Sequence, residues 1–119
     1  MGDELTAGTR KVDSLAFSVV IPTFDRPHLL RASLESLVGQ RFPRDRFEVI
    51  VVDDGGTVPA QAVAEAYMGQ LSLTVCRQSQ AGPSAARNAG AERARAPYIA
   101  FLDDDCRADP AWLHELEAR

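Results

Sequence analysis

The sequence lacks the features that would assign it at once to a membrane or a secreted class. Its two cysteines, Cys76 and Cys106, are far apart and form no CxxC pair, which favours reduced thiols over a disulfide framework. No apolar run approaches the roughly 20 residues of a membrane-spanning helix. Residues 1–14 are polar, without an apolar signal-peptide core. We therefore expect a cytoplasmic protein with a flexible leader over residues 1–15 and no membrane span in this chain.

Several nucleotide and metal motifs are also missing. The first apolar run is not followed by GxGxxG, and no GxxxxGK[ST] loop is present. His28 and His114 are isolated, so a histidine metal cluster is excluded. The formal net charge is -4, which argues against a nucleic-acid partner. A phosphorylated ligand is still allowed, because a few arginines or one metal ion can hold a diphosphate.

What the sequence does contain is a regular alternation of two kinds of segment. At 119 residues the chain fits one domain. Four apolar runs predict strands, and a stretch suited to a helix follows each of them. Three of the four runs are continuously apolar, as is typical of strands buried on both faces of a parallel sheet. The order predicts an α/β fold with a parallel sheet of about four strands and right-handed crossovers. The predicted strands are residues 17–21, 47–52, 71–75 and 98–102, and the predicted helices are residues 27–38, 59–68, 83–96 and 111–117.

Three of the predicted strands end in a polar cluster. The clusters are residues 22–26, residues 53–55 and residues 103–105. Ligands of open parallel sheets bind outside the carboxyl ends of the strands, near a switch in strand order. We therefore expect the three clusters to meet at one edge of the sheet and to form the functional site.

The run of three acids, Asp103, Asp104 and Asp105, directly follows an apolar strand. Adjacent carboxylates repel one another, and a divalent cation would remove the repulsion. Hard oxygen ligands suit Mg²⁺ or Mn²⁺, with substrate phosphate oxygens completing the shell. The alternative is a solvated acidic turn. Along an extended chain, Asp103 and Asp105 would lie on one side and Asp104 on the other.

Two further groups belong to the same expected edge. A carboxylate of Asp53 or Asp54 could accept hydrogen bonds from a ribose hydroxyl or a base N–H, although an Asx-turn is a serious alternative. Arg87 lies early in the third predicted helix, whose N-terminus suits phosphate. It could add a full charge to a phosphate site, pair with one of the acids, or be an ordinary surface arginine.

Taken in order, four segments resemble the successive motifs of family-2 glycosyltransferases with the GT-A fold. No single segment is specific, but four at plausible separations are, and the resemblance runs from about Phe17 to the last residue. It implies inverting transfer of a sugar from a UDP- or GDP-sugar donor, with Mg²⁺ or Mn²⁺ as the cofactor and an acceptor that the sequence does not identify. The segments are residues 19–26 (VVIPTFDR), 49–55 (VIVVDDG), 82–90 (GPSAARNAG) and 98–105 (YIAFLDDD).

The resemblance also implies roles for individual residues. Asp54 would contact the base, with Asp53 supporting its loop, and Arg87 would be a donor-site arginine. Asp105 would be the metal ligand, assisted by Asp103, while Asp104 would face the ribose. The nucleoside pocket would be lined by Pro22, Thr23 and Phe24.

One departure from the family's pattern concerns the end of the chain. Such domains continue past the DxD helix into strands that bind the acceptor and supply the catalytic base, whereas this chain ends at Arg119. We therefore expect a fragment of a longer protein, with residues 16–119 as the nucleotide-sugar-binding part and the fold truncated after the DxD motif. The family's strand order would leave residues 98–102 on an open edge, where the chain could self-associate. A non-catalytic module that binds nucleotide or protein through this edge is the alternative function. A receiver domain is disfavoured, because no acidic pair follows the first strand.

Overall fold

The computed structural model describes residues 14–119, so most of the predicted leader lies outside the described residues. Leu15, the last residue of that predicted leader, is buried. The centre of the fold is a parallel sheet in the order β3-β2-β1-β4. Its strands are β1 (Phe17–Thr23), β2 (Phe47–Asp53), β3 (Leu73–Arg77) and β4 (Tyr98–Phe101). The predicted α/β fold with a four-stranded parallel sheet is confirmed.

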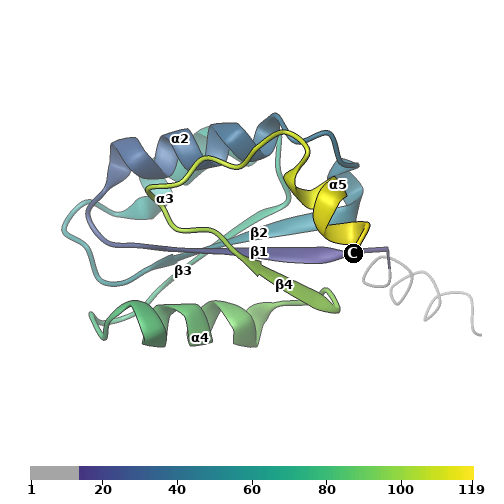
Figure 1. The fold of residues 1–119 in the computed structure, drawn as a ribbon. Helices are drawn as coiled ribbons and strands as arrows, with labels where there is room; N and C mark the ends of the chain where they lie inside the picture. The colour runs from purple at the N-terminus through teal and green to yellow at the C-terminus, as the bar shows by residue number, and fades with distance from the viewer. Residues whose placement is uncertain (1–13) are drawn as a thin grey trace, which may run out of the picture.

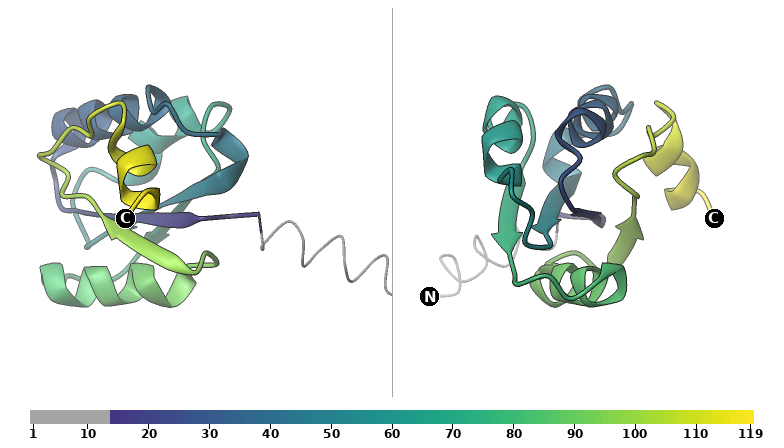
Figure 2. Two further views of the ribbon diagram at one scale, coloured as in Figure 1. Left: turned by 45° about the vertical axis from the view of Figure 1, so that its right-hand side comes forward. Right: turned by 90° about the vertical axis from the view of Figure 1, so that its left-hand side faces the viewer.

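Helices cover both faces of the sheet, as expected for parallel strands joined by crossovers. The helices α2 (Pro27–Val38), α3 (Ala60–Ala64) and α5 (Trp112–Glu117) lie on one face. Of the helices in the described part of the chain, α4 (Pro83–Arg93) is the one that lies on the other face, as both ribbon views show (Figures 1 and 2). Short 3-10 helices span Arg44–Arg46 and Glu65–Tyr67. Within residues 14–119, no helix has the length and apolar character needed to cross a bilayer.

Each face of β1 and β2 contributes to a separate part of the core. Val19, Ile21 and their neighbours on β2 pack beneath α2 and α3, against Leu30, Leu34 and Leu37. These leucines recur at helical spacing, so they form one apolar stripe. The smaller cluster on the opposite face joins Val20, Ile50, Val52 and Ala86 of α4. Both central strands are therefore buried on both faces, as their continuous apolar runs predict.

The first strand continues two residues beyond the predicted end. Proline was expected to stop it at Pro22, but β1 pairs with β2 as far as Thr23. The carbonyl of Val20 accepts from Leu102 N on the β4 side, so the nitrogen of Pro22, two residues on, faces the same side. The pairing of β1 with β4 ends at Val20, so Pro22 has no ladder partner to lose there.

Other boundaries differ for local reasons. The third strand begins at Leu73 rather than Leu71, because Leu71 N still bonds to Tyr67 O and closes a helical turn. The helix α4 ends at Arg93, before Ala94 takes an extended conformation. The expectation that the fourth strand is buried on both faces is wrong: among its residues only Ala100 is buried, because β4 is an edge strand.

Candidate functional site

A pocket of about 360 Å³ lies at the carboxyl ends of β1, β2 and β4. In the order β3-β2-β1-β4 the chain leaves β3 at one edge and re-enters the sheet as β4 beside β1, which makes the β1–β4 junction the switch point of the topology. All the sequence-predicted residues except Asp53 line this pocket. The lining consists of Pro22, Thr23, Phe24, Arg26, Asp54, Gln80, Gly82, Pro83, Ala86, Arg87, Asp103, Asp104 and Asp105.

The two neighbouring acids at the end of β2 face different surroundings. Asp53 supports the following loop: its Oδ1 accepts from Gly56 N at 3.0 Å, and its Oδ2 accepts from Ala60 N at 2.9 Å. Its Oδ2 also pairs with Arg77 Nη1 at 2.8 Å. Asp53 therefore fixes the loop after β2 and the start of α3, and it is not among the residues that line the pocket.

Asp54 instead holds the loop between β3 and α4. Its Oδ1 accepts from Gln78 Nε2 at 2.8 Å and Ala81 N at 2.9 Å, and its Oδ2 accepts from Gly82 N at 3.0 Å. Burial raises the pKa of Asp54, but these hydrogen bonds outweigh it and hold the pKa below the ordinary value of 3.8. The side chain is therefore a buried carboxylate whose oxygens are shared with the protein's own donors.

The same loop is pressed against Gly55. A Cβ on Gly55 would lie 2.8 Å from Gln80 N, and its φ of +83° belongs to the region that favours glycine. The turn after β2 and the loop before α4 are thus in direct contact, and together they form one wall of the pocket. Gln80, which belongs to none of the sequence motifs, also lines the pocket.

Of the three consecutive aspartates, Asp104 points into the protein. Its Oδ2 accepts from the hydroxyl of Thr23 at 2.8 Å, and its Oδ1 pairs with Arg26 Nη1 at 3.2 Å. The side chain is only 8% exposed. This carboxylate connects the end of β1 to the end of β4, and Arg26, which was not selected from the sequence as a site residue, completes the contact.

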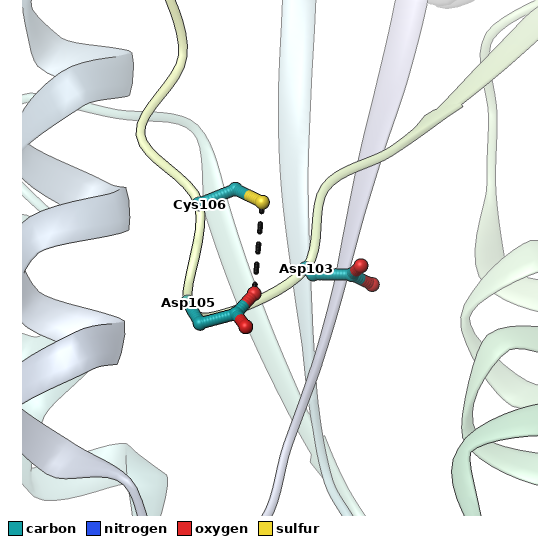
Figure 3. A group of neighbouring side chains, drawn as sticks. All are labelled: Asp103, Asp105 and Cys106. Carbon is teal, nitrogen blue, oxygen red and sulfur yellow. Dashed lines mark hydrogen bonds between the residues drawn. The ribbon is translucent and has the colours of Figure 1, made fainter.

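Asp103 and Asp105, which alternation places on one side of the chain, lie together at the surface. One carboxylate oxygen from each and the thiol of Cys106 lie within 4.8 Å of one another (Figure 3). Desolvation raises the pKa of the Cys106 thiol, and the hydrogen bond to Asp105 and the negative charge of the aspartates raise it further. The donor set is therefore two carboxylates beside a neutral thiol, and two hard oxygen donors fit Mg²⁺ or Mn²⁺.

Helix α2 fixes the loop that carries these acids. The hydroxyl of Ser33 contacts the main-chain carbonyl oxygens of Asp104, at 3.1 Å, and of Cys106. The hydroxyl of Ser36 accepts from Ala108 N at 2.9 Å. The sequence analysis missed Ser33, although a serine among Leu30, Leu34 and Leu37 on an otherwise apolar face is an available signal.

Arg87 reaches the acids from α4. Its Nη2 lies 3.2 Å from Asp103 Oδ1, and both side chains are partly exposed. The N-terminus of α4 opens on the same pocket, because Gly82, Pro83 and Ala86 line it beside Arg87. The positive end of the α4 helix dipole and the guanidinium of Arg87 make this wall suited to an anion.

Comparison with known proteins agrees with this geometry. The sequence model of the family described as Glycosyl transferase family 2 matches residues 18–119. The chain is 36% identical over 108 residues to hyaluronan synthase from Pasteurella multocida, covering 87% of this chain and 11% of that protein. It is 39% identical over 103 residues to validoxylamine A glucosyltransferase from Streptomyces hygroscopicus, covering 85% of this chain and 24% of that protein.

Solved structures show the same arrangement of elements. Staphylococcus aureus TarS 1-349 in complex with UDP-GlcNAc matches with a TM-score of 0.84 and 32% identity, covering 87% of this chain and 30% of that one. The mannosyltransferase PcManGT from Pyrobaculum calidifontis, in complex with GDP-Man and Mn²⁺, matches with a TM-score of 0.76 and 23% identity, over 85% of this chain and 34% of that one. The second likeness concerns the fold alone. The chain spans about a third or less of the length of these relatives.

Proposed function

Because this chain belongs to glycosyl transferase family 2, we propose that its pocket binds the nucleotide-diphosphate sugar of an inverting glycosyltransferase, together with a divalent metal. The observation that carries the proposal is the convergence on one pocket of apolar, anionic and cationic groups from three strand ends and one helix start. The protein's relatives include enzymes that transfer glucose and N-acetylglucosamine by name.

The pocket offers a suitable group for each part of such a donor. Pro22 and Phe24 supply an apolar wall for the nucleoside. Asp54 lines the pocket and is held as a carboxylate by its hydrogen bonds, so it can accept a further hydrogen bond from a base N–H. The N-terminus of α4 and Arg87 face the position where a diphosphate would lie.

The three consecutive aspartates would contact the metal and the ribose. Asp105 and Asp103 would hold the metal, and Asp104 would face the ribose while it keeps Thr23 and Arg26 in place. A divalent cation bound there would neutralise charge on the diphosphate leaving group. The family and the Mn²⁺-containing structural neighbour suggest a divalent metal of the Mg²⁺ or Mn²⁺ type.

The proposal is tested by titrating the chain with UDP and with GDP, each with and without Mn²⁺. The heat of binding is measured by calorimetry, and the melting temperature of the chain by thermal unfolding. We expect one nucleotide to bind in a metal-dependent way and to raise the melting temperature by mass action. Asp105→Ala should lower that affinity at least ten-fold, because it removes half of the carboxylate donors. Glu92→Gln, which removes an exposed carboxylate outside the pocket, should leave it unchanged. Binding that needs no metal and survives Asp105→Ala would refute the metal site.

A second candidate function uses the open edge of the sheet. Among the described residues, strand β4 pairs with β1 on one side and with no strand on the other, and Tyr98, Ile99 and Phe101 are exposed. A hollow of about 690 Å³ lies between β4, the start of β1 and α5. We propose that a second copy of the chain pairs with this edge, since two β4 strands related by a two-fold axis can pair antiparallel.

A further inference from the structure

The three consecutive aspartates differ in the cation that each contacts. Arg26 pairs with Asp104, and Arg87 pairs with Asp103, each across 3.2 Å. Within residues 14–119, Asp105 forms no ion pair, and its carboxylate accepts a hydrogen bond from the thiol of Cys106. The protein therefore neutralises two of three adjacent negative charges with its own arginines, and one of those two is a carboxylate of the proposed metal site.

Burial separates a fixed pair from an exchangeable one. The Asp104 side chain is 8% exposed and is also bonded to Thr23, so removing Arg26 from it would leave a buried carboxylate short of a partner. The Asp103 side chain is 56% exposed and that of Arg87 is 39% exposed. Water can replace either member of this second pair at little cost, because ion pairs between exposed side chains contribute little to stability.

Two ligands compete for the members of the exchangeable pair. A divalent metal needs the Asp103 oxygen that Arg87 now contacts, and a diphosphate needs a cation at the start of α4, where Arg87 stands. We infer that Arg87 couples the two binding events: it neutralises Asp103 while the site is empty, and it turns to the diphosphate once metal holds Asp103. The inference rests on the proposed function and adds an exchange of partners to it.

The exchange predicts effects of opposite sign for one substitution. Without nucleotide, Arg87 opposes metal binding, so Arg87→Ala should tighten the binding of Mn²⁺ alone by about two- to five-fold, the equivalent of an exposed ion pair. With Mn²⁺ present, Arg87 contributes charge-assisted hydrogen bonds to the diphosphate. The same change should therefore lower the affinity for UDP or GDP roughly ten-fold or more. By linkage, the nucleotide should also enhance Mn²⁺ affinity less in the variant than in the wild type.

A matched control separates the ion pair from the general loss of positive charge. Arg107 lies two residues after Asp105, is exposed, does not line the pocket and forms no ion pair within residues 14–119. Arg107→Ala removes the same charge near the same acids, so it reports the long-range electrostatic effect by itself. Titration calorimetry on the wild type, Arg87→Ala and Arg107→Ala would use Mn²⁺ alone, then UDP and GDP with saturating Mn²⁺.

We expect tighter Mn²⁺ and weaker nucleotide binding in Arg87→Ala, with both affinities near the wild-type values in Arg107→Ala. Unchanged or weaker Mn²⁺ binding in Arg87→Ala, beside a wild type that binds Mn²⁺ and nucleotide, overturns the exchange and leaves the proposed function standing. An equal gain in Mn²⁺ affinity in both variants also overturns it, because the ion pair would then be irrelevant. A wild type that binds neither Mn²⁺ nor UDP nor GDP overturns the proposed function and the exchange with it.

Discussion

At the scale of single residues, identical side chains differ through their neighbours. Asp53 and Asp54 are adjacent, yet one fixes the start of α3 and the other holds the loop before α4. Asp103 and Asp104 divide in the same way between the surface and the interior. The side of the chain on which a residue lies follows from alternation, but its partner depends on which distant segment is packed there.

Asp54 gives a pH prediction at this scale. Its pKa is lowered in the folded protein, so its contribution to stability is fully present above the ordinary value of 3.8 and is lost as the pH falls through the lowered pKa. Asp54→Asn should reduce the free energy of unfolding at pH 7 by about 1–3 kcal/mol, because it loses an ionised acceptor of buried hydrogen bonds. The difference in the free energy of unfolding between Asp54→Asn and the wild type should stay constant from about pH 8 to 5 and shrink below about pH 4.

Urea denaturation of both proteins at pH 7, 5 and 3 measures this difference. Asp45→Asn is the control, since Asp45 is exposed in a short 3-10 helix, and it should change stability little at any of these pH values. A deficit in Asp54→Asn that is as large at pH 3 as at pH 7 would contradict the role assigned to the ionised carboxylate.

At the scale of elements, the position of α4 determines the anion-binding wall of the pocket. This helix has little apolar surface of its own and approaches the sheet closely at Gly90. A Cβ there would lie 2.3 Å from Val20 Cγ1 and 3.1 Å from Val52 Cγ2. The absence of a side chain therefore sets the distance between α4 and the strands, and with it the position of Arg87.

Gly90→Ala should accordingly destabilise the fold by about 1–3 kcal/mol, as overpacking of a core does, and should weaken nucleotide binding because α4 must shift. Gly69→Ala is the matched control, since a Cβ at Gly69 would meet nothing within 4 Å. Its melting temperature should stay the same or rise slightly. Equal melting temperatures for the two variants would show that the helix adjusts without cost.

At the scale of the whole molecule, the open edge of the sheet is formed by β4, whose outer backbone groups pair with no other strand among the described residues. Strand β4 exposes Tyr98, Ile99 and Phe101, and Ala100 is its one buried residue. A strand that is apolar on both faces and lies at an edge is a template for pairing. Substitutions on this edge therefore test the pairing of two copies of the chain and leave the pocket unchanged.

Sedimentation velocity over a range of concentrations tests the pairing of two copies. We expect the wild type to associate as its concentration rises and Phe101→Glu to remain monomeric, because a charge on the edge opposes pairing. Val58→Glu is the control: Val58 is similarly exposed but lies away from β4, so that variant should associate like the wild type. A wild type that is monomeric at every concentration would exclude the self-association.

Much of the site could be predicted from the sequence because it depends on local patterns. Continuous apolar runs marked the strands, and the polar residues after them had to meet, because the carboxyl ends of parallel strands share an edge. Pro22, Thr23, Phe24, Asp54, Arg87 and the three aspartates all line one pocket for this reason. The length of β1 was underestimated, because the effect of a proline depends on which side its nitrogen faces.

The α/β class, the order of the elements and the edge where the polar clusters gather all follow from the amino-acid sequence, because hydrophobic period and turn residues act over a few neighbouring positions. The partner of each polar group, in contrast, depends on tertiary packing. Asp104 meets Thr23 across 81 positions, Ser33 meets the loop after β4, and Arg87 meets Asp103 only because α4 and β4 lie on opposite sides of one pocket. Such contacts depend on where the packed elements come to rest, and no local pattern carries that information.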